Sequence, residues 1–330
     1  MRSLLAALFV VSTSASAYEL KRDSTGEPAS WKTPLRFVID DAFASKLKTA
    51  GAHDAITAAL ETVNDAIPTL KLEAKAGKPR GMGYDFENPK ASTSDVLAPA
   101  EWTYNVDAVA TTVITISRTT HQIIEADIAF NVRHTDFAVV AGAPETVRYD
   151  IQNAMTHELG HALGLAHNDL PNTVMFPRSV PGEISKRTLA ADDVEGLKFL
   201  YGKPVEVTAE EAARGCSATG SAPFALVALM MVVLLRRRRV LVAVAALVGG
   251  FAFVAPVFAA PNTFVERTWK VSKVSTLAPL GGPAVLQSDV TFVRDGQEVT
   301  VRIAGGRWGN LEQVVEGVAV PLVGQAFVAL

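Results

Sequence analysis

The sequence predicts an α+β fold followed by apolar helical segments. Between residues 31 and 203, short runs rich in β-branched residues are separated by stretches in which apolar residues recur at helical spacing. Beyond residue 203, two long apolar runs stand on either side of four consecutive arginines. We therefore expect one globular domain and, after it, segments of membrane or export character.

The composition agrees with this division. The 330 residues are 49% hydrophobic and 20% charged, with a mean hydropathy of +0.22. That is too apolar for an ordinary soluble enzyme and too polar for a polytopic membrane protein. The net charge of −3 argues against nucleic acid as a partner. The single cysteine excludes an intramolecular disulfide framework and a cysteine-rich metal site.

The first apolar run has the layout of a secretory signal peptide. Residues 1–17 combine Arg2, the apolar stretch Leu4–Val11 and a small-residue cleavage site at Ala15–Ala17. A buried first strand or an uncleaved anchor is the alternative, although so short an apolar stretch cannot cross a bilayer. We expect cleavage after Ala17, export of the chain, and a short N-terminal segment over residues 18–30.

The globular part, residues 31–203, contains alternating predicted elements. Strands are expected at 35–39, 111–116, 123–130 and 137–140, with another starting at 70–72, and helices at 45–67, 151–163 and 190–200. Asp150 is placed to cap the second of these helices. Residues 77–102 are rich in Gly, Pro, Asn, Ser and Asp, which predicts a long surface loop.

The predicted helix at 151–163 contains the first part of the pattern H-E-x-x-H-x-x-G-x-x-H, which runs from His157 to His167. His157 and His161 are four residues apart, so both imidazoles lie on one helix face and can reach one metal ion. Glu158 is rotated by about 100° from His157, which places its carboxylate beside the metal as a general base. Gly164 can adopt positive φ and turn the chain, so that His167 returns as a third ligand. The fourth position is left for water, as in catalytic zinc sites.

Other interpretations of the histidines stay open. The motif could bind zinc without turnover, which would make the protein a non-catalytic zinc-binding surface module. His134 with Asp136 is a candidate for a secondary metal site, although a solvated loop histidine is the simpler interpretation. His53 and His121 are interpreted as surface or core residues.

The extended motif resembles the metzincin signature, and its flanks resemble the matrixin branch, the relatives of the matrix metalloproteinases. Asn172–Pro177 is similar to the Met-turn, with Met175 following His167; residues 125–131, 149–152 and 189–202 are similar to a sheet strand, the approach to the active-site helix and the closing helix. The resemblance covers residues 31–202. It implies a metzincin catalytic domain, with a twisted mixed sheet over the active-site helix and a small C-terminal subdomain that carries the Met-turn.

The same resemblance implies a zinc-dependent endopeptidase that acts on protein or peptide substrates. One catalytic Zn²⁺ would activate water, and Glu158 would take the proton and pass it to the leaving amine. Met175 would form an apolar floor beneath the histidines. An edge strand would pair with the substrate backbone, for which we choose 137–140, and Pro177 and Arg178 would wall the side-chain pocket.

Two features of the matrix metalloproteinases have no match in the sequence. We find no second zinc site and no calcium loops before the motif, so the need for Ca²⁺ stays open. No cysteine precedes the motif, and the segment before Trp31 is too short for a prodomain of about 80 residues, so latency through a cysteine switch is not expected.

Residues 204–239 are interpreted as a linker and a sorting or anchor tail. Cys216 lies between Gly215 and Ser217 and is followed by a spacer, the apolar run 222–235 and Arg236–Arg239. This layout resembles the MYXO-CTERM surface-sorting tail, which implies that Cys216 is a processing or anchoring point. An ordinary transmembrane anchor is the alternative. We expect a location at the cell surface or outer envelope, or secretion.

Residues 240–260 form a second apolar segment, without a charge and long enough to cross a membrane. With the preceding arginines the segment is also similar to a second signal peptide. Sorting tails end soon after their arginines, so residues 261–330 are interpreted as a β-rich, fused or read-through extension. A competing hypothesis makes the chain a membrane protein whose extension is the working part.

Overall fold

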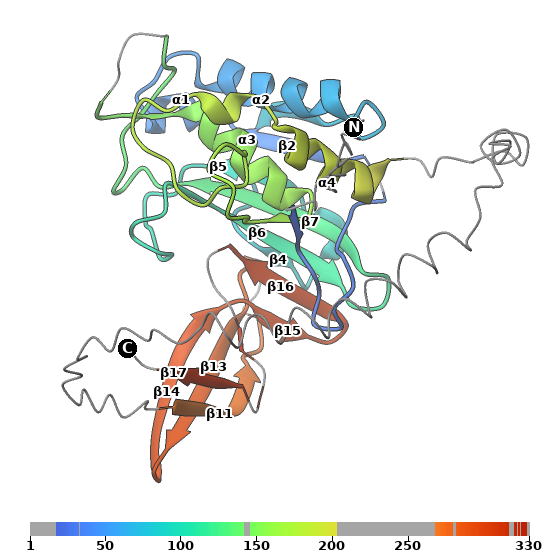
Figure 1. The fold of residues 1–330 in the computed structure, drawn as a ribbon, viewed down its shortest axis with the longest axis vertical. Coiled ribbons are helices and arrows are strands. Elements are labelled where there is room, and N and C mark those ends of the chain that lie inside the picture. Colours follow the sequence, from blue (N-terminus) through green and yellow to red (C-terminus); the bar gives the residue numbers. More distant parts are fainter. Residues whose placement is uncertain are drawn as a thin grey trace, which may run out of the picture. The chain divides into compact units, whose positions relative to one another are not determined.

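A seven-stranded mixed sheet organises the described part of the chain, with strand order β15-β16-β6-β7-β5-β2-β3 (Figure 1). The structure is a computed structural model that describes residues 18–32, 34–141, 146–202, 268–279 and 282–316, together with 320–321, 323 and 325–328. The described residues before and after the undescribed stretch 203–267 belong to one compact unit. The signal peptide, Cys216 and the apolar segments at 222–235 and 240–260 lie outside the described residues.

Parallel and antiparallel strands both occur in this sheet. Strands β3 (Glu73–Gly77), β2 (Arg36–Asp40), β5 (Ser94–Leu97) and β7 (Gln122–Phe130) run parallel to one another. Strand β6 (Ala110–Ser117) is antiparallel to β7, and β16 (Leu311–Val315) is antiparallel to β6. Strand β15 (Gly306–Trp308) completes the order at the β16 side. The predicted strands at 35–39, 111–116 and 123–130 are confirmed as β2, β6 and β7.

The helices pack beside and on the sheet. Helix α2 (Ala52–Ala66) contacts α3 (Ile151–Ala162), and α3 contacts β6 and β7 (Figure 1). Helix α3 turns a fully buried apolar stripe toward the core, formed by Ile151, Met155, Leu159 and Ala162. This spacing is that of one helix face, so the opposite positions remain free for the site. Helix α4 (Ala191–Tyr201) matches the predicted helix at 190–200 within one residue at each end.

The predicted helix at 45–67 is divided in two. Helix α1 (Phe43–Lys46) ends before a turn in which Lys48 has φ +52° and Gly51 has φ +76°. Such left-handed backbone cannot continue a right-handed helix, so α2 starts afresh at Ala52. The apolar periodicity did not reveal the interruption.

The prediction of a continuous surface loop at 77–102 was wrong. The segment contains β4 (Tyr84–Asp85), the 3₁₀ helix η1 (Pro89–Ala91) and β5, which is fully buried between β2 and β7. The first two residues of the strand, Ser94 and Asp95, are polar, but their polar groups are satisfied inside the protein. Asp95 accepts N–H bonds from Arg80 and Gly81, and the Ser94 hydroxyl accepts one from Ala126.

Two pairs of short strands close to the motif helix lie outside the main sheet. Strand β1 (Glu19–Leu20) pairs with β10 (Leu165–Ala166), and β8 (Phe137–Ala138) pairs with β9 (Tyr149–Asp150). The strand predicted at 137–140 is therefore reduced to two buried residues in a separate sheet, and the large sheet presents β6 toward the site instead.

The C-terminal strands form a second sheet and a hairpin. The four-stranded sheet has the order β14-β13-β11-β17, built from β11 (Thr268–Thr276), β13 (Gln287–Arg294), β14 (Gln297–Ala304) and β17 (Ala326–Val328). Strand β12 (Pro283–Ala284) pairs with β4, while the β15–β16 hairpin extends the main sheet. Within the described residues, no helix is both long and apolar enough to cross a membrane.

Candidate metal centre

The helix that carries the motif has a well-defined start. Asp150 is extended, and its side chain accepts the backbone N–H of Asn153 at 2.8 Å, as an N-cap does. The same carboxylate is held by the guanidinium of Arg187, with Nε 2.8 Å from Oδ1. Burial of this ion pair at the first turn fixes where α3 begins and therefore how its later turns face the sheet.

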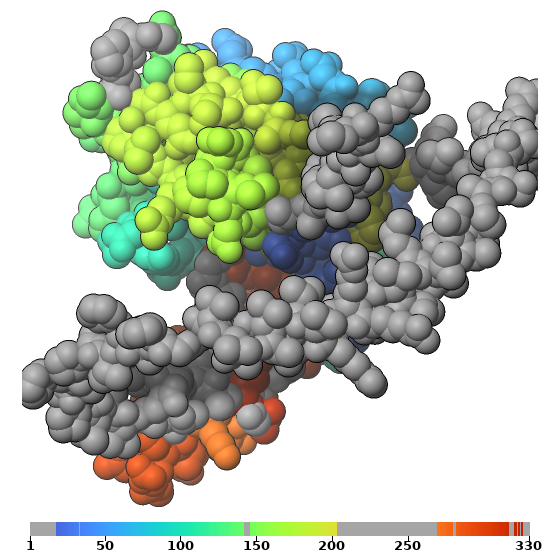
Figure 2. All heavy atoms as spheres, in the orientation of Figure 1, coloured from blue at the N-terminus to red at the C-terminus, as the bar shows by residue number. Residues whose placement is uncertain are grey.

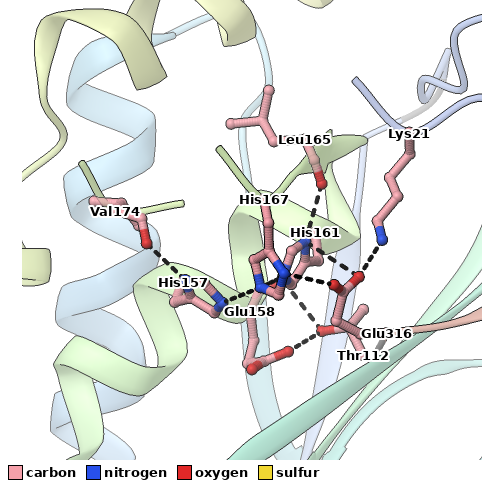
Figure 3. Close-up of polar contacts among 9 residues, drawn as sticks. All are labelled: Lys21, Thr112, His157, Glu158, His161, Leu165, His167, Val174 and Glu316. Atoms are coloured by element: carbon pink, nitrogen blue, oxygen red, sulfur yellow. Dashed lines mark hydrogen bonds and ion pairs between the residues drawn. The ribbon is translucent and has the colours of Figure 1, made fainter. Parts of the chain in front are cut away.

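Three imidazoles converge at the C-terminal end of α3 (Figure 3). His157 and His161 lie one turn apart with ring centroids 4.7 Å from each other. Nε2 of His167 lies 3.1 Å from Nε2 of His157 and 3.1 Å from Nε2 of His161. The structure thus brings together the three histidines that the sequence motif marks as ligands.

Gly164 makes the return of His167 possible. Its φ of +96° lies in the region that disfavours side chains, and a Cβ at this position would overlap the carbonyl oxygen of Ala29. The chain therefore reverses sharply after α3 and continues as β10, which ends one residue before His167.

Hydrogen bonds orient two of the rings. Nδ1 of His157 lies 2.6 Å from the carbonyl oxygen of Val174, and Nδ1 of His161 lies 3.0 Å from that of Leu165. A carbonyl only accepts, so each Nδ1 carries the proton and each Nε2 presents its lone pair to the centre. Burial lowers the pKa of all three histidines, which favours the neutral form that binds metals.

The geometry and the donor set fit a zinc ion. Tetrahedral Zn–N bonds of about 2.0–2.1 Å place two ligand nitrogens about 3.3 Å apart, close to the 3.1 Å between these nitrogens. Among the described residues, these histidines are the one group of three or more His, Cys, Asp or Glu whose ligand atoms gather closely enough to hold an ion. The candidate pair His134 and Asp136 is exposed and belongs to no such group.

Glu158 lies against β6 rather than pointing to solvent. It is 5% exposed, and the hydroxyl of Thr112 donates a 2.6 Å hydrogen bond to its Oε2. Burial raises the pKa of Glu158 to about 8, with the Glu316 carboxylate adding to the rise and the Thr112 bond opposing it. A cation held by the histidines would favour the charged form of this carboxylate.

A cavity of about 490 Å³ opens beside these residues. Its lining comes from the segment before β6, from α3, and from the chain after the Met-turn; among the lining residues are Ala110, His157, Glu158, His167, Pro177 and Arg178. Residues from α3 to α4, green to olive in Figure 2, form much of the face shown there. Pro177 and Arg178 thus lie at the wall of the cavity, where they were expected.

Met175 is buried beneath the histidine helix with 2% exposure. A Cβ on Gly160 would overlap its Sδ, so the residue between Leu159 and His161 must be glycine for Met175 to pack there. The Asp193 carboxylate accepts the backbone N–H groups of Val174 and Met175 at 2.9 and 3.2 Å. Asp193 therefore anchors the Met-turn from α4.

Several residues of the site were missed by the sequence reasoning. The ammonium of Lys186 donates to the carbonyl oxygens of Phe176 and Arg178, which holds the wall of the cavity. Thr112 orients Glu158, and Glu316 reaches the histidines from β16's end. Thr112 lies in a strand that the sequence did predict, but nothing in a strand pattern shows which helix residue it faces.

The remaining histidines lie away from the centre. Nε2 of His53 lies 3.3 Å from the carbonyl oxygen of Asp40, and Nδ1 of His121 lies 2.5 Å from Oδ2 of Asp23. These contacts agree with their interpretation as residues of the fold rather than of the metal centre.

The sheet over the motif helix, the three converging imidazoles and the buried methionine beneath them define the metzincin class. The matrixin family model matches residues 30–202, just over half of the 330-residue chain. The chain therefore belongs to the matrixin family, and the family resemblance stated from the motif is confirmed.

Curated relatives match shorter parts of the chain. Metalloendoproteinase 1 of Glycine max is 28% identical over 127 residues, 38% of this chain and 34% of its own length. Matrilysin of Homo sapiens is 48% identical over 50 residues, 15% of this chain and 19% of its own. Neutrophil collagenase of Homo sapiens is 32% identical over 74 residues, 22% of this chain and 16% of its own length. The chain thus spans about a third or less of the length of these relatives.

Proposed function

We propose that the protein is an exported zinc-dependent endopeptidase of the matrixin type. The observation that carries the proposal is the convergence of three imidazoles, with Nε2 of His167 3.1 Å from Nε2 of His157 and from Nε2 of His161, beside a cavity that Glu158 also lines. Membership of the matrixin family supports the assignment of peptide or protein substrates.

Each residue of the centre has a separate role in the proposed reaction. His157, His161 and His167 hold one Zn²⁺, which when bound supplies the Lewis acidity that makes water a nucleophile at neutral pH. Glu158 removes a proton from the attacking water and delivers it to the leaving amine. Thr112 keeps the Glu158 carboxylate in one orientation through its 2.6 Å bond. Met175 supports the two helix histidines from below.

The remaining parts of the chain are assigned from the sequence. We interpret residues 1–17 as the export signal, 18–30 as a short lead segment and 31–203 as the catalytic domain. Cys216 and the 204–239 segment would attach the enzyme to the cell surface, with 240–260 as a further apolar segment and 261–330 as a β-rich extension. The layout of apolar runs, arginines and cysteine supports this division.

The direct test uses the purified full chain. We expect about one zinc per chain and cleavage of an unfolded protein that a chelator stops and added zinc restores. Glu158→Ala should retain zinc but lose cleavage by at least about a hundredfold, the usual scale of general acid–base catalysis. Glu195→Ala, an exposed glutamate of α4, is the matched control and should cleave like the parent.

Two results would reject the proposal. A chain that binds no zinc cannot work in this way, and equal cleavage by the parent and Glu158→Ala would remove Glu158 from the mechanism. Zinc binding without any chelator-sensitive cleavage would favour the non-catalytic zinc-binding module.

A further inference from the structure

Strand β16 lies on the outer edge of β6, the strand that borders the metal centre. The two strands pair antiparallel from Leu311 opposite Ser117 to Val315 opposite Val113. The pairing continues one step further, because the N–H of Glu316 donates to the carbonyl oxygen of Thr112 at 2.9 Å. Thr112 is the residue that orients Glu158, so β16 ends directly beside the proposed catalytic base.

The side chain that follows β16 enters the site (Figure 3). Oε1 of Glu316 lies 3.3 Å from Nδ1 of His167, and Oε2 lies 3.5 Å from Nδ1 of His161. The ammonium of Lys21, from the N-terminal segment, forms an ion pair with the same carboxylate. The Glu316 side chain is 12% exposed and that of Lys21 16%, so this charge pair is largely withdrawn from water.

The cavity reaches β6 only at its start, and β16 occupies most of the edge of this strand. The cavity is lined by Ala110 of β6 and, before it, by Asn105 and residues 107–109. Strand β16 pairs with residues 113 to 117, and the N–H of Glu316 bonds to Thr112. Most of the edge next to the metal centre is therefore occupied by an extended segment of this chain, and the cavity lies at the start of that edge.

We propose that residues 311–316 are a tethered peptide ligand of the cleft, which blocks extended substrates until it is displaced. The proposal rests on the function proposed above. An unpaired strand edge binds an extended peptide through backbone hydrogen bonds, and each edge position can pair with one strand at a time. Lys21 makes the cleft selective for peptides with an acidic side chain at this position, because its ammonium forms an ion pair with the carboxylate that lies where Glu316 does.

Covalent connection to the rest of the chain explains how a segment as short as residues 311–316 can stay bound in the cleft. Joined to the same chain, the segment binds at an effective concentration in the mM range, so even weak pairing keeps the edge occupied. Released from the chain, the same segment competes only at its actual concentration. Long substrates that need the β6 edge from residue 112 onward as well as the cavity are therefore excluded more strongly than short ones that enter the cavity alone.

The test is built on the full chain with a site-specific protease sequence inserted between residues 204 and 266. Size-exclusion chromatography after cleavage and dilution separates chains that have lost the C-terminal part from those that have not. Cleavage of a long quenched peptide gives one readout. Binding of a labelled hexapeptide with the sequence of residues 311–316, Leu-Glu-Gln-Val-Val-Glu, gives a second readout that does not depend on turnover.

Substitutions in the uncut chain give a second route to the open state. Glu316→Gln keeps the size of the side chain but removes the charge that Lys21 and the histidines face. Glu298→Gln, an exposed glutamate of β14, makes the same chemical change in the same C-terminal part and serves as the control.

We expect the opened chain and the Glu316→Gln chain to bind the labelled hexapeptide at least about tenfold more tightly than the closed parent and the control, and the opened chain to cleave the long peptide about tenfold faster. A hexapeptide with its last Glu replaced by Gln should bind more weakly to the opened chain.

Equal cleavage and equal hexapeptide binding by closed and opened chains would overturn the inference while leaving the proposed function intact. Loss of zinc or unfolding of the opened chain would also overturn the inference, because the C-terminal part would then be a structural component of the domain rather than a ligand of the cleft. Absence of cleavage in every form, with zinc bound and hexapeptide bound only by the opened chain, would reject the endopeptidase and retain the tethered ligand.

Discussion

The hydroxyl of Thr112 in β6 donates a hydrogen bond of 2.6 Å to Oε2 of Glu158 in α3. It also lies 3.2 Å from the backbone oxygen of Glu158, so one strand residue fixes both the side chain and the helix turn that carries it. The contact ties the orientation of the proposed base to the edge strand on which an extended peptide would bind.

Replacement of Thr112 by valine should therefore slow turnover without unfolding the protein. The shape is nearly unchanged, but the carboxylate loses the partner that orients it, so we expect kcat to fall by about tenfold, equivalent to about 1.4 kcal/mol. The Thr112 hydrogen bond lowers the pKa of Glu158, so its loss should raise that pKa. Because the base must be ionised, the acid limb of the kcat/KM profile should move to higher pH.

The neighbouring threonine provides a matched control for this substitution. The hydroxyl of Thr111 is buried without a hydrogen-bond partner within the described structure. Thr111→Val removes a polar atom that makes no bond, so stability should stay the same or rise and the pH profile should not move. Similar pH profiles for the two variants would contradict the role given to Thr112.

Gly160→Ala tests the packing between the motif helix and the Met-turn. Alanine favours a helix over glycine by about 1 kcal/mol, yet the added Cβ would overlap Sδ of Met175. We expect overpacking to win, with a net loss of about 1–3 kcal/mol in urea unfolding and weaker zinc retention. In the Gly160→Ala, Met175→Ala double variant the overlap is removed, so the two losses should not add. Additive losses would show that the two residues do not interact.

The acid stability of the protein should depend on Asp23. Burial acts to raise the pKa of this residue, but hydrogen bonds from Thr25 and His121 outweigh it and bring the pKa to about 2 from an ordinary value of 3.8. A lowered folded-state pKa stabilises the protein above the unfolded value and loses that contribution as the pH falls through the folded one. We therefore expect Asp23→Asn to have a lower Tm than the parent at pH 5 and above.

The difference in Tm should then narrow as the pH falls from about 4 to 2, because the parent carboxylate is protonated in that window. Asp41→Asn, at an exposed position next to β2, is the control and should follow the parent at every pH. A difference in Tm that stays constant down to pH 2 would mean that Asp23 acts through its shape rather than its charge.

Much of the candidate site could be predicted from local sequence. Histidines four residues apart on a helix share a face whatever surrounds them, and a glycine three residues later permits the turn that His167 needs. The cap at Asp150 follows from the same local rules, and the structure shows it as a 2.8 Å bond. The spacing of residues along the chain is enough to predict short-range geometry of this kind.

The errors arose where the environment decides the outcome. Strand β5 was taken for loop because Ser94 and Asp95 look solvent-exposed in sequence, whereas backbone donors from 77–102 and β7 satisfy them inside the sheet. The strand expected at 137–140 forms only at 137–138 and pairs with β9 outside the main sheet, because strand order depends on pairings between distant segments.

The sequence by itself determined the metal-binding motif, the family to which it belongs and the majority of the elements around it, because these depend on residues a few positions apart. Only the tertiary structure decided that Thr112 holds Glu158, that Gly160 makes room for Met175, and that Lys21 and Glu316 meet beside His167. Pairing between β6 and β16 joins residues about two hundred positions apart. No local pattern encodes such a contact, because its free energy depends on which strand edge the rest of the fold leaves open.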